Sequence, residues 1–206
     1  GLERIFADKG TQGDFYAHAS AGCLHVRPLI NLKSLEGMRQ MRAITEEVVK
    51  LANEFGGAMS GEHGDGLARS EWLEATFGPE LMAAFRQLKE AADPRGVLNP
   101  GKILDAPPMD ENLRYGVDYE TKTWSTLLSF EGQGGLAGAI EMCNGAGVCR
   151  KHGGVMCPSF QASQDEMHST RGRANLLRDM ISGRSGSADS QQIVFEALDL
   201  CLECKG

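Results

Sequence analysis

The sequence lacks an excess of positive charge, and this absence argues against a nucleic-acid partner. Its 206 residues carry a formal net charge of −7, whereas binding phosphates requires a basic face. No apolar run is long enough to span a bilayer, and no charged and apolar leader of a secretion signal opens the chain. Hydrophobic residues still make up 41% of the chain, so we expect a packed core.

The sequence also lacks an initiator methionine, and it stops inside a cysteine motif that begins at Cys201. We therefore expect the chain to be a fragment cut at both ends. Its length is enough for one large domain or two small ones. No internal repeat or long low-complexity tract is present.

Cysteine is almost absent from the first two thirds of the chain, where only Cys23 occurs. Without a secretion signal, clustered cysteines favour metal or cluster ligands over disulfides. The remaining cysteines all lie in the last third and are Cys143, Cys149, Cys157, Cys201 and Cys204.

Local patterns predict an α+β first half and a mostly helical second half. Residues 23–28 predict a strand, and Ser34 is placed to cap a helix that follows it. A short strand at 58–60 is expected to deliver Glu62. In the second half, Ser163 begins a capping-box pattern that predicts the start of a helix.

A change of composition after residue 105 predicts a domain boundary. The Pro-rich stretch there is typical of an extended linker. We expect a first domain over 1–105, a linker over 106–140 and a truncated helical domain over 141–206.

Histidine and carboxylate residues occur together in glycine-containing segments. Glu62 and His63 are adjacent within 60–66, and His18 and His25 bracket a second such segment. Two imidazoles and one carboxylate form a common ligand set for catalytic zinc or a similar divalent metal. The alternative is a pair of polar loop histidines and a solvated carboxylate.

These segments resemble the C-terminal domain of FAD-linked oxidases of the vanillyl-alcohol-oxidase superfamily, in particular the D-2-hydroxyglutarate and D-lactate dehydrogenase branch. There, a Gly-His-x-x-Asp-Gly-Asn-Leu-His segment supplies two metal-binding histidines, and an x-Glu-His-Gly segment supplies a third ligand and a flavin-facing histidine. The resemblance implies that His18, His25 and Glu62 bind a divalent metal, with zinc as the expected ion. It implies that His63 faces FAD.

The resemblance covers about the first half of the chain and continues through 93–102, which is similar to the family's closing segment beside the flavin. It implies cofactor contacts at Asn99 and Lys102. The sequence departs from the family at Cys23, which stands where asparagine usually contacts substrate or flavin. The alternative for Cys23 is a small buried hydrophobic residue.

The implied chemistry is oxidation of a small 2-hydroxy acid to the 2-oxo acid. The metal would hold the substrate carboxylate and hydroxyl, and His63 would take the hydroxyl proton as general base. Hydride would pass to the flavin. Arg27 is a candidate carboxylate clamp, or equally a surface salt-bridge arginine.

The late cysteines resemble the ferredoxin pattern C-x2-C-x2-C-x3-C-P. Cys157 precedes a proline, and Cys201 and Cys204 begin a second copy. These three cysteines, with one beyond the chain, would bind a [4Fe–4S] cluster. Cys143 and Cys149 would belong to an altered copy.

In that altered copy Ala146 replaces a cysteine, and His152 is one candidate substitute. Zinc is the alternative for the cysteines. The stretch 169–174 resembles the iron–sulfur extension of some FAD-linked oxidases. Arg171 and Arg173 within it either solvate a helix face or offset the negative charge of a cluster.

The sequence therefore indicates an α+β fold, in which the C-terminal part of an FAD-linked oxidase substrate domain precedes a mostly α-helical ferredoxin-like segment. The implied function is FAD- and [4Fe–4S]-dependent oxidation of a D-2-hydroxy acid of the D-2-hydroxyglutarate or D-lactate type. The alternative is an electron-transfer or metal-binding module, with zinc or iron–sulfur, that has no catalytic activity of its own.

The expected partners are the small hydroxy acid, an electron acceptor such as a quinone or an electron carrier, and the remainder of the same polypeptide. The expected location is cytoplasmic, or peripheral at the inner membrane. We expect this polypeptide alone to bind FAD poorly and to be inactive.

Overall fold

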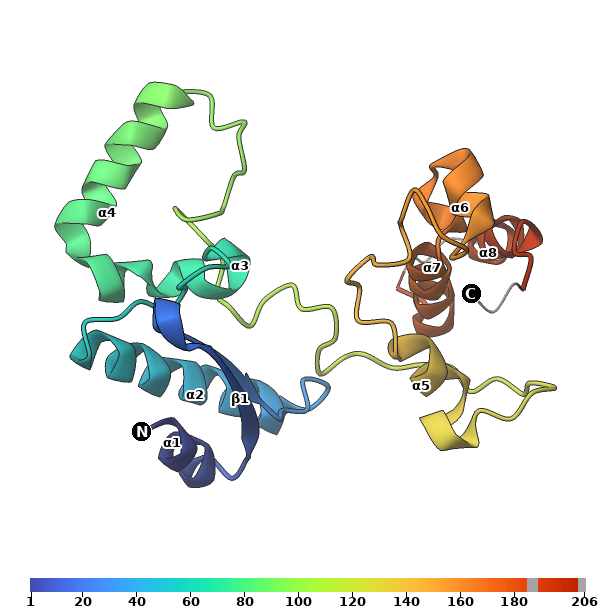
Figure 1. Ribbon diagram of the computed structural model, residues 1–206, viewed down its shortest axis with the longest axis horizontal. Coiled ribbons are helices and arrows are strands. Elements are labelled where there is room, and N and C mark those ends of the chain that lie inside the picture. The colour runs from blue at the N-terminus through green and yellow to red at the C-terminus, as the bar shows by residue number, and fades with distance from the viewer. Residues whose placement is uncertain (185–188, 204–206) are drawn as a thin grey trace. The chain divides into compact units, whose positions relative to one another are not determined.

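The computed structural model describes residues 1–184 and 189–203. The chain divides into two compact units, Gly1–Asp118 and Tyr119–Gly206 (Figure 1). Buried hydrophobic side chains occur in both units. The boundary falls within the stretch 106–140 that the sequence indicates as a linker. Helices predominate in both units, and their bounds are α1 Leu2–Asp8, α2 Leu35–Glu54, α3 Gly66–Arg69, α4 Leu73–Ala92, α5 Gly135–Glu141, α6 Pro158–Ser163, α7 Thr170–Ser182 and α8 Ser190–Asp199.

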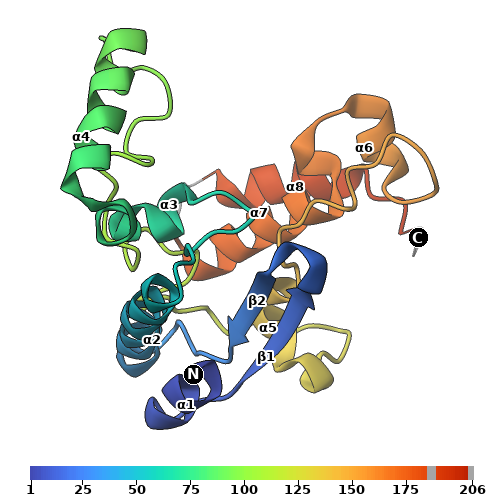
Figure 2. The ribbon, with the colours of Figure 1, turned by 60° about the vertical axis from the view of Figure 1, so that its left-hand side comes forward.

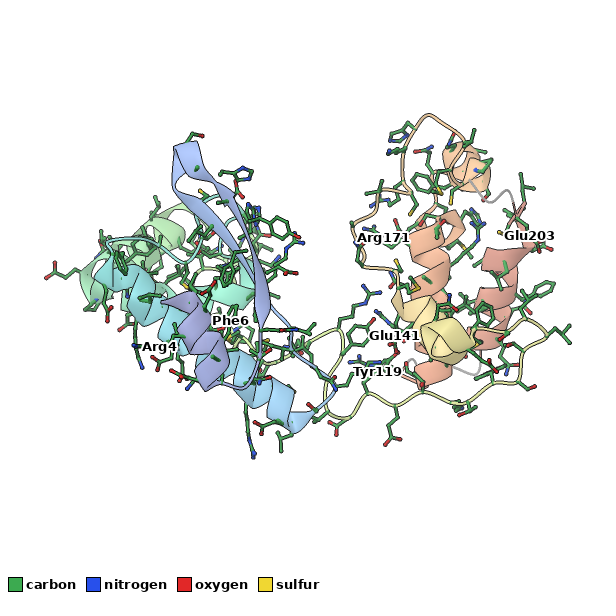
Figure 3. All side chains as sticks on the ribbon, turned by 60° about the horizontal axis from the view of Figure 1, so that its bottom comes forward. Arg4, Phe6, Tyr119, Glu141, Arg171 and Glu203 are labelled. Atoms are coloured by element: carbon green, nitrogen blue, oxygen red, sulfur yellow. The ribbon has the colours of Figure 1, made fainter. Side chains whose placement is uncertain are left out.

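An antiparallel hairpin gives the first unit its β structure (Figure 2). Strand β1 spans Gly13–His18 and strand β2 spans Cys23–Pro28, with a short 3₁₀ turn between them. Because side chains alternate across a strand, Phe15 and His18 point to opposite faces. Phe15 stacks on Phe6 of α1 with ring centroids 5.5 Å apart. Figure 3 labels Phe6 on α1 beside the hairpin. The hairpin is thereby fixed on its hydrophobic face, and its histidines lie on the other.

Helix α2 joins the hairpin to the loop that carries Glu62. The hydroxyl of Ser34 accepts a hydrogen bond from the N–H of Gly37 at 3.0 Å, which is the expected N-terminal cap. The apolar side of α2 buries Ile44 and Val49, and the helix packs against α1 and α4. The α+β class expected for this half is confirmed.

In the part of the second unit that the structure describes, the regular elements are all helical, and loops connect them. Helix α7 lies at its centre and packs against α5 and α8. Its buried hydrophobic residues include Ile140 of α5, Phe160 of α6, Ile181 of α7 and Val194 of α8. This core supports the loops that carry the cysteines.

Two local predictions are wrong. Residues 58–60 form no strand. Glu62 lies instead in a loop, in which the hydroxyl of Ser60 donates to the carbonyl of Gly64. The capping box at Ser163 does not start a helix, because Ser163 ends α6. Helix α7 begins seven residues later, at Thr170, and the side chain of its N-cap residue Ser169 accepts from the N–H of Gly172 at 2.9 Å. Within the described residues, no helix has both the length and the apolar character needed to cross a membrane.

Candidate functional site

The hairpin brings His18 and His25 onto one face. In the register of the two strands, Tyr16 pairs with His25 and His18 pairs with Cys23, so the two histidines are diagonal neighbours across the ladder. Their ring centroids lie 5.0 Å apart, with an interplanar angle of 80°. Strand β1 itself was not predicted, although the β-forming pair Phe15 and Tyr16 signals it.

The loop that carries Glu62 lies directly against this face. The hydroxyl of Ser60 donates to the carbonyl of Gly64 at 3.0 Å, and Arg69 donates to the same carbonyl at 3.1 Å. A Cβ atom at Gly61 would lie 2.8 Å from the Sγ atom of Cys23. Only glycine at this position lets the loop approach the hairpin so closely.

Glu62 connects the imidazoles. Its Oε1 atom lies 2.7 Å from Nε2 of His25 and 3.6 Å from Nε2 of His18. One ligand atom from each of the three residues lies within 4.8 Å of the others. Ligand atoms at about 2.0–2.2 Å from one zinc ion are at most about 4.4 Å apart. The trio therefore fits a divalent metal after a small side-chain adjustment.

His63 completes the cluster without belonging to the ligand trio. Its Nε2 atom lies 3.1 Å from Oε1 of Glu62, and its ring centroid lies 5.1 Å from that of His25. The side chain is 59% exposed, whereas that of His25 is 21% exposed. An exposed imidazole beside a carboxylate is suited to exchange protons with a bound molecule.

The other residues expected at this site have different placements. Arg27 lies on the same strand face as His25, and its guanidinium lies 4.9 Å from the ring centroid of Tyr16. Asn99 and Lys102 are exposed residues in the turns after α4, and neither belongs to the ligand trio. Cys23 is half-buried beside Gly61.

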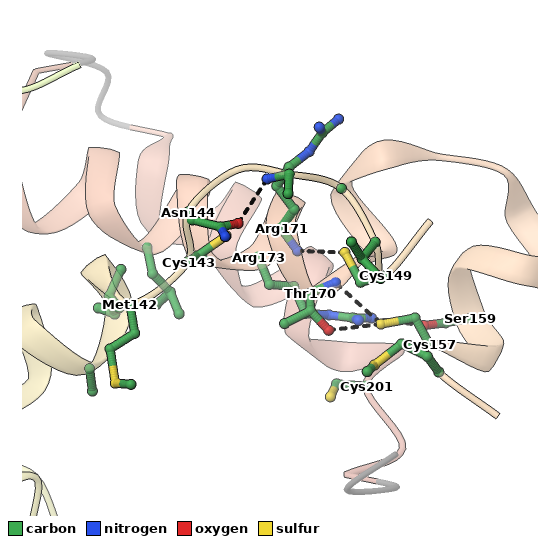
Figure 4. A pocket seen from close by; sticks show the side chains of 18 of the residues that line it. Met142, Cys143, Asn144, Cys149, Cys157, Ser159, Thr170, Arg171, Arg173 and Cys201 are labelled. Carbon is green, nitrogen blue, oxygen red and sulfur yellow. Dashed lines mark hydrogen bonds between the residues drawn. The ribbon is translucent and has the colours of Figure 1, made fainter. Parts of the chain in front are cut away.

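The four cysteines that the structure describes in the second unit line one cavity of about 820 Å³ (Figure 4). Its apolar lining includes Phe130, Ile140 and Leu177. The described cysteines of this unit form no disulfide. Those that line the cavity are Cys143, Cys149, Cys157 and Cys201.

Two of the sulfurs accept hydrogen bonds from the first turn of α7. The N–H of Thr170 donates to Sγ of Cys157 at 3.2 Å, and the hydroxyl of Thr170 lies 2.9 Å from the same sulfur. The N–H of Arg171 donates to Sγ of Cys149 at 3.3 Å. Hydrogen-bond donors of this kind favour a charged sulfur over a neutral one. Among the described residues, only His18, His25 and Glu62 have ligand atoms close enough to surround a single ion, and the cysteines do not.

The remaining predictions for this unit have mixed outcomes. Ala146 lines the cavity, but His152 is exposed and is not among the lining residues. Cys204 lies outside the described residues. Thr170 had no predicted role, although its place in the stretch 169–174 signalled one.

The two arginines of this stretch differ. Arg173 is buried, so a role in solvating a helix face is wrong for it. Arg171 donates to Glu166 at 2.7 Å and to the carbonyl of Gly145 at 3.1 Å. The hydrogen bond from Arg171 holds the pKa of Glu166 below its usual range, and the same contact raises the pKa of Arg171.

Comparisons with known proteins match the first unit to a known family. Residues 1–103 match the family of FAD linked oxidases, C-terminal domain. The chain is 36% identical over 174 residues to the D-2-hydroxyglutarate dehydrogenase of Escherichia coli K12, an alignment that covers 84% of this chain and 17% of that protein. The match to the protein of the same name from Pseudomonas putida KT2440 is 36% identical over 178 residues, covering 81% and 16%.

A D-lactate dehydrogenase from Anaerostipes hadrus is 38% identical over 89 residues, which is 43% of this chain and 19% of that protein. The chain thus spans less than a fifth of the length of each of these relatives. No solved structure matches it. With the match over residues 1–103, the chain belongs to the FAD-linked oxidases, as a member of their C-terminal domain family.

Proposed function

We propose that the chain supplies the metal-binding and proton-transfer side of an FAD-dependent active site that oxidises a D-2-hydroxy acid. The convergence of three imidazoles on Oε1 of Glu62 carries this proposal. The names of the relatives favour substrates of the D-2-hydroxyglutarate or D-lactate type. The flavin supplies the hydride acceptor.

In this proposal His18, His25 and Glu62 hold a divalent metal, and zinc suits this set of nitrogen and oxygen ligands. The ion supplies a Lewis acid for the substrate hydroxyl. His25 is the least exposed of the three, so it is the innermost ligand in this proposal. His18 and Glu62 close the ligand set from the solvent side.

His63 accepts the proton of the substrate hydroxyl in this scheme. Its open side chain leaves room for a substrate, and the contact with Glu62 fixes the orientation of its ring. Arg27, stacked over Tyr16 on the same strand face, binds a substrate carboxylate. Guanidinium pairs with carboxylate through two parallel hydrogen bonds.

We propose that the cysteine cavity of the second unit holds a [4Fe–4S] cluster that takes electrons onward to a quinone or an electron carrier. Cys157 precedes a proline, and its sulfur lies against the first turn of α7. Backbone N–H groups of this turn donate to the sulfurs of Cys157 and Cys149. Such a donor set suits a cluster with net negative charge. The proposed location is cytoplasmic, or peripheral at the inner membrane.

A second candidate is a binding module without catalysis, favoured by the position of all four described cysteines of the second unit on one cavity. In that case the cysteines hold zinc or a cluster, and the histidine cluster holds a structural ion. The two candidates differ in whether a bound flavin is reduced by substrate.

The test is anaerobic mixing of the full-length flavoprotein with D-2-hydroxyglutarate or D-lactate, with bleaching of the flavin absorbance as the readout. We expect bleaching with at least one acid and none with the L-enantiomer. His63→Ala should slow bleaching by about 10²–10⁴-fold, the usual contribution of a general base. Arg39→Ala, a change at an exposed side chain of α2 in the same unit, is the control. Absence of bleaching with both acids, or equal rates in His63→Ala, would favour the module.

A further inference from the structure

The first turn of α7 forms hydrogen bonds with two cysteine sulfurs of the cavity. Thr170 reaches Sγ of Cys157 with both its N–H, at 3.2 Å, and its hydroxyl, at 2.9 Å. The adjacent N–H of Arg171 reaches Sγ of Cys149 at 3.3 Å. These N–H groups have no partner within the helix because they belong to its first turn. The sulfurs of Cys157 and Cys149 accept the hydrogen bonds of these two N–H groups.

Neighbouring residues hold this turn rigidly. Ser169 is fully buried, and its hydroxyl accepts from Gly172 and donates to the carbonyl of Glu166 at 2.8 Å. A Cβ atom at Gly172 would lie 1.9 Å from that same carbonyl oxygen. The turn thus has little freedom to move away from the cysteines.

Arg173 fixes the turn to the rest of the unit. Its buried guanidinium donates to the carbonyl of Ala197 at 2.7 Å and to the hydroxyl of Ser159 at 2.9 Å. It also donates to the carbonyl of His168 at 2.5 Å. These bonds join α6, α7 and α8, which flank the loops that carry Cys157 and Cys201.

We infer that Thr170 is a positioning residue that sets the reduction potential of a cluster bound through Cys157. The inference rests on the proposed iron–sulfur function of this cavity. A thiolate bound to iron carries no proton, so the Thr170 hydroxyl becomes the donor and the sulfur the acceptor. Adding an electron increases the negative charge on the cluster, and hydrogen bonds to its sulfurs stabilise that charge. Thr170 therefore raises the potential.

Thr170→Val tests the hydroxyl alone, because valine keeps the branched shape and the backbone N–H. Thr170→Ser keeps the hydroxyl, and Thr123→Val changes an exposed threonine of the same unit. The full-length protein is prepared anaerobically with iron and sulfide. The readouts are iron and acid-labile sulfide content, the visible spectrum and the midpoint potential from an EPR-monitored redox titration.

We expect equal cluster content in all four proteins and a more negative midpoint potential in Thr170→Val only. The expected shift changes the ratio of reduced to oxidised cluster about tenfold at a fixed potential, which is about 59 mV for one electron. A cluster with the same potential in Thr170→Val and wild type overturns this inference alone. A wild-type protein with zinc and no iron at the cysteines overturns the proposed electron relay and this inference with it.

Discussion

At the scale of single residues, the contact between Gly61 and Cys23 sets how closely the glutamate loop approaches the histidine hairpin. Cys23 is small, half-buried and 3.8 Å from the carbonyl of Ala21. Its sulfur occupies the space that a side chain at position 61 would need. The position of Glu62 relative to His25 therefore depends on two neighbouring residues that bind no metal themselves.

Gly61→Ala should weaken divalent metal binding by about 10–100-fold, the usual cost of disturbing the residues that orient metal ligands. The new methyl group must push Cys23 or the loop aside, which moves Glu62 from the histidines. Zinc affinity measured by competition with a chromogenic chelator is the readout. The double variant Gly61→Ala, Cys23→Ala removes the obstructing sulfur and should recover most of the affinity. A loss that the second substitution does not relieve would contradict the steric argument.

At the scale of elements, the first turn of α7 and the loops around it form one packed group. Gly172→Ala should destabilise the chain by about 1–3 kcal/mol, the usual cost of overpacking, since its Cβ would meet the carbonyl of Glu166. Gly153→Ala is the matched control, because a Cβ there would have no atom within 4 Å. Urea unfolding followed by circular dichroism distinguishes them. Equal midpoints in the two variants would show that the turn relaxes without cost.

A second element-scale prediction concerns the ion pair between α2 and the turn before α4. Burial raises the pKa of Glu71, but hydrogen bonds from Arg42 and from the N–H of Met109 outweigh it and hold the pKa below the ordinary value of 4.5. A carboxyl with a lowered folded-state pKa stabilises the fold above its unfolded pKa and loses this effect as pH falls through the folded value.

Glu71→Gln should therefore lower the free energy of unfolding by about 1–3 kcal/mol near neutral pH, and by less as the pH falls below 4.5. Urea titrations at several pH values measure the difference. Glu111→Gln, at an exposed glutamate of the same unit, should show no such trend. A difference that is constant with pH would argue against the ion pair.

The sequence predicted elements best where a cap or a periodic pattern was strong. The helix after Ser34 and strand β2 were found because each has a local signal. Strand β1 was not predicted, because its local signal is only the pair Phe15 and Tyr16. Its extent follows from its pairing with β2, in which Tyr16 lies opposite His25. Ser163 carried a capping pattern, yet Ser169 caps α7, since tertiary contacts around Cys157 decide where that helix begins.

The same distinction applies to the site. His18, His25 and Glu62 were selected from residue types and motif, and the structure gathers them. The sequence singled out the stretch 169–174 as a whole. It did not predict the contact of Thr170 with Cys157, because this contact depends on a loop 13 residues away that folds back onto the first turn of α7.

At the scale of the whole molecule, the chain has two separate cores joined by a stretch without regular structure. Leu127 and Leu128 in this stretch are among the most exposed hydrophobic residues described. Limited digestion with chymotrypsin should cut first within 123–129, because exposed and unstructured backbone is cleaved fastest. Mass spectrometry of the first fragments is the readout. Replacing Trp124, Leu127 and Leu128 with aspartate should slow this cut, because Trp124 is also exposed in this window. A first cut inside α2, α4 or α7 would contradict the division.

The central claim is that His18, His25 and Glu62 bind one divalent metal ion. The most direct measurement is the metal content of the full-length protein by elemental analysis, compared between wild type, Glu62→Gln and Glu111→Gln after identical purification. The account predicts that Glu62→Gln holds about one equivalent of divalent metal less than the other two, whatever the cysteines bind. Equal metal content in all three proteins would contradict it.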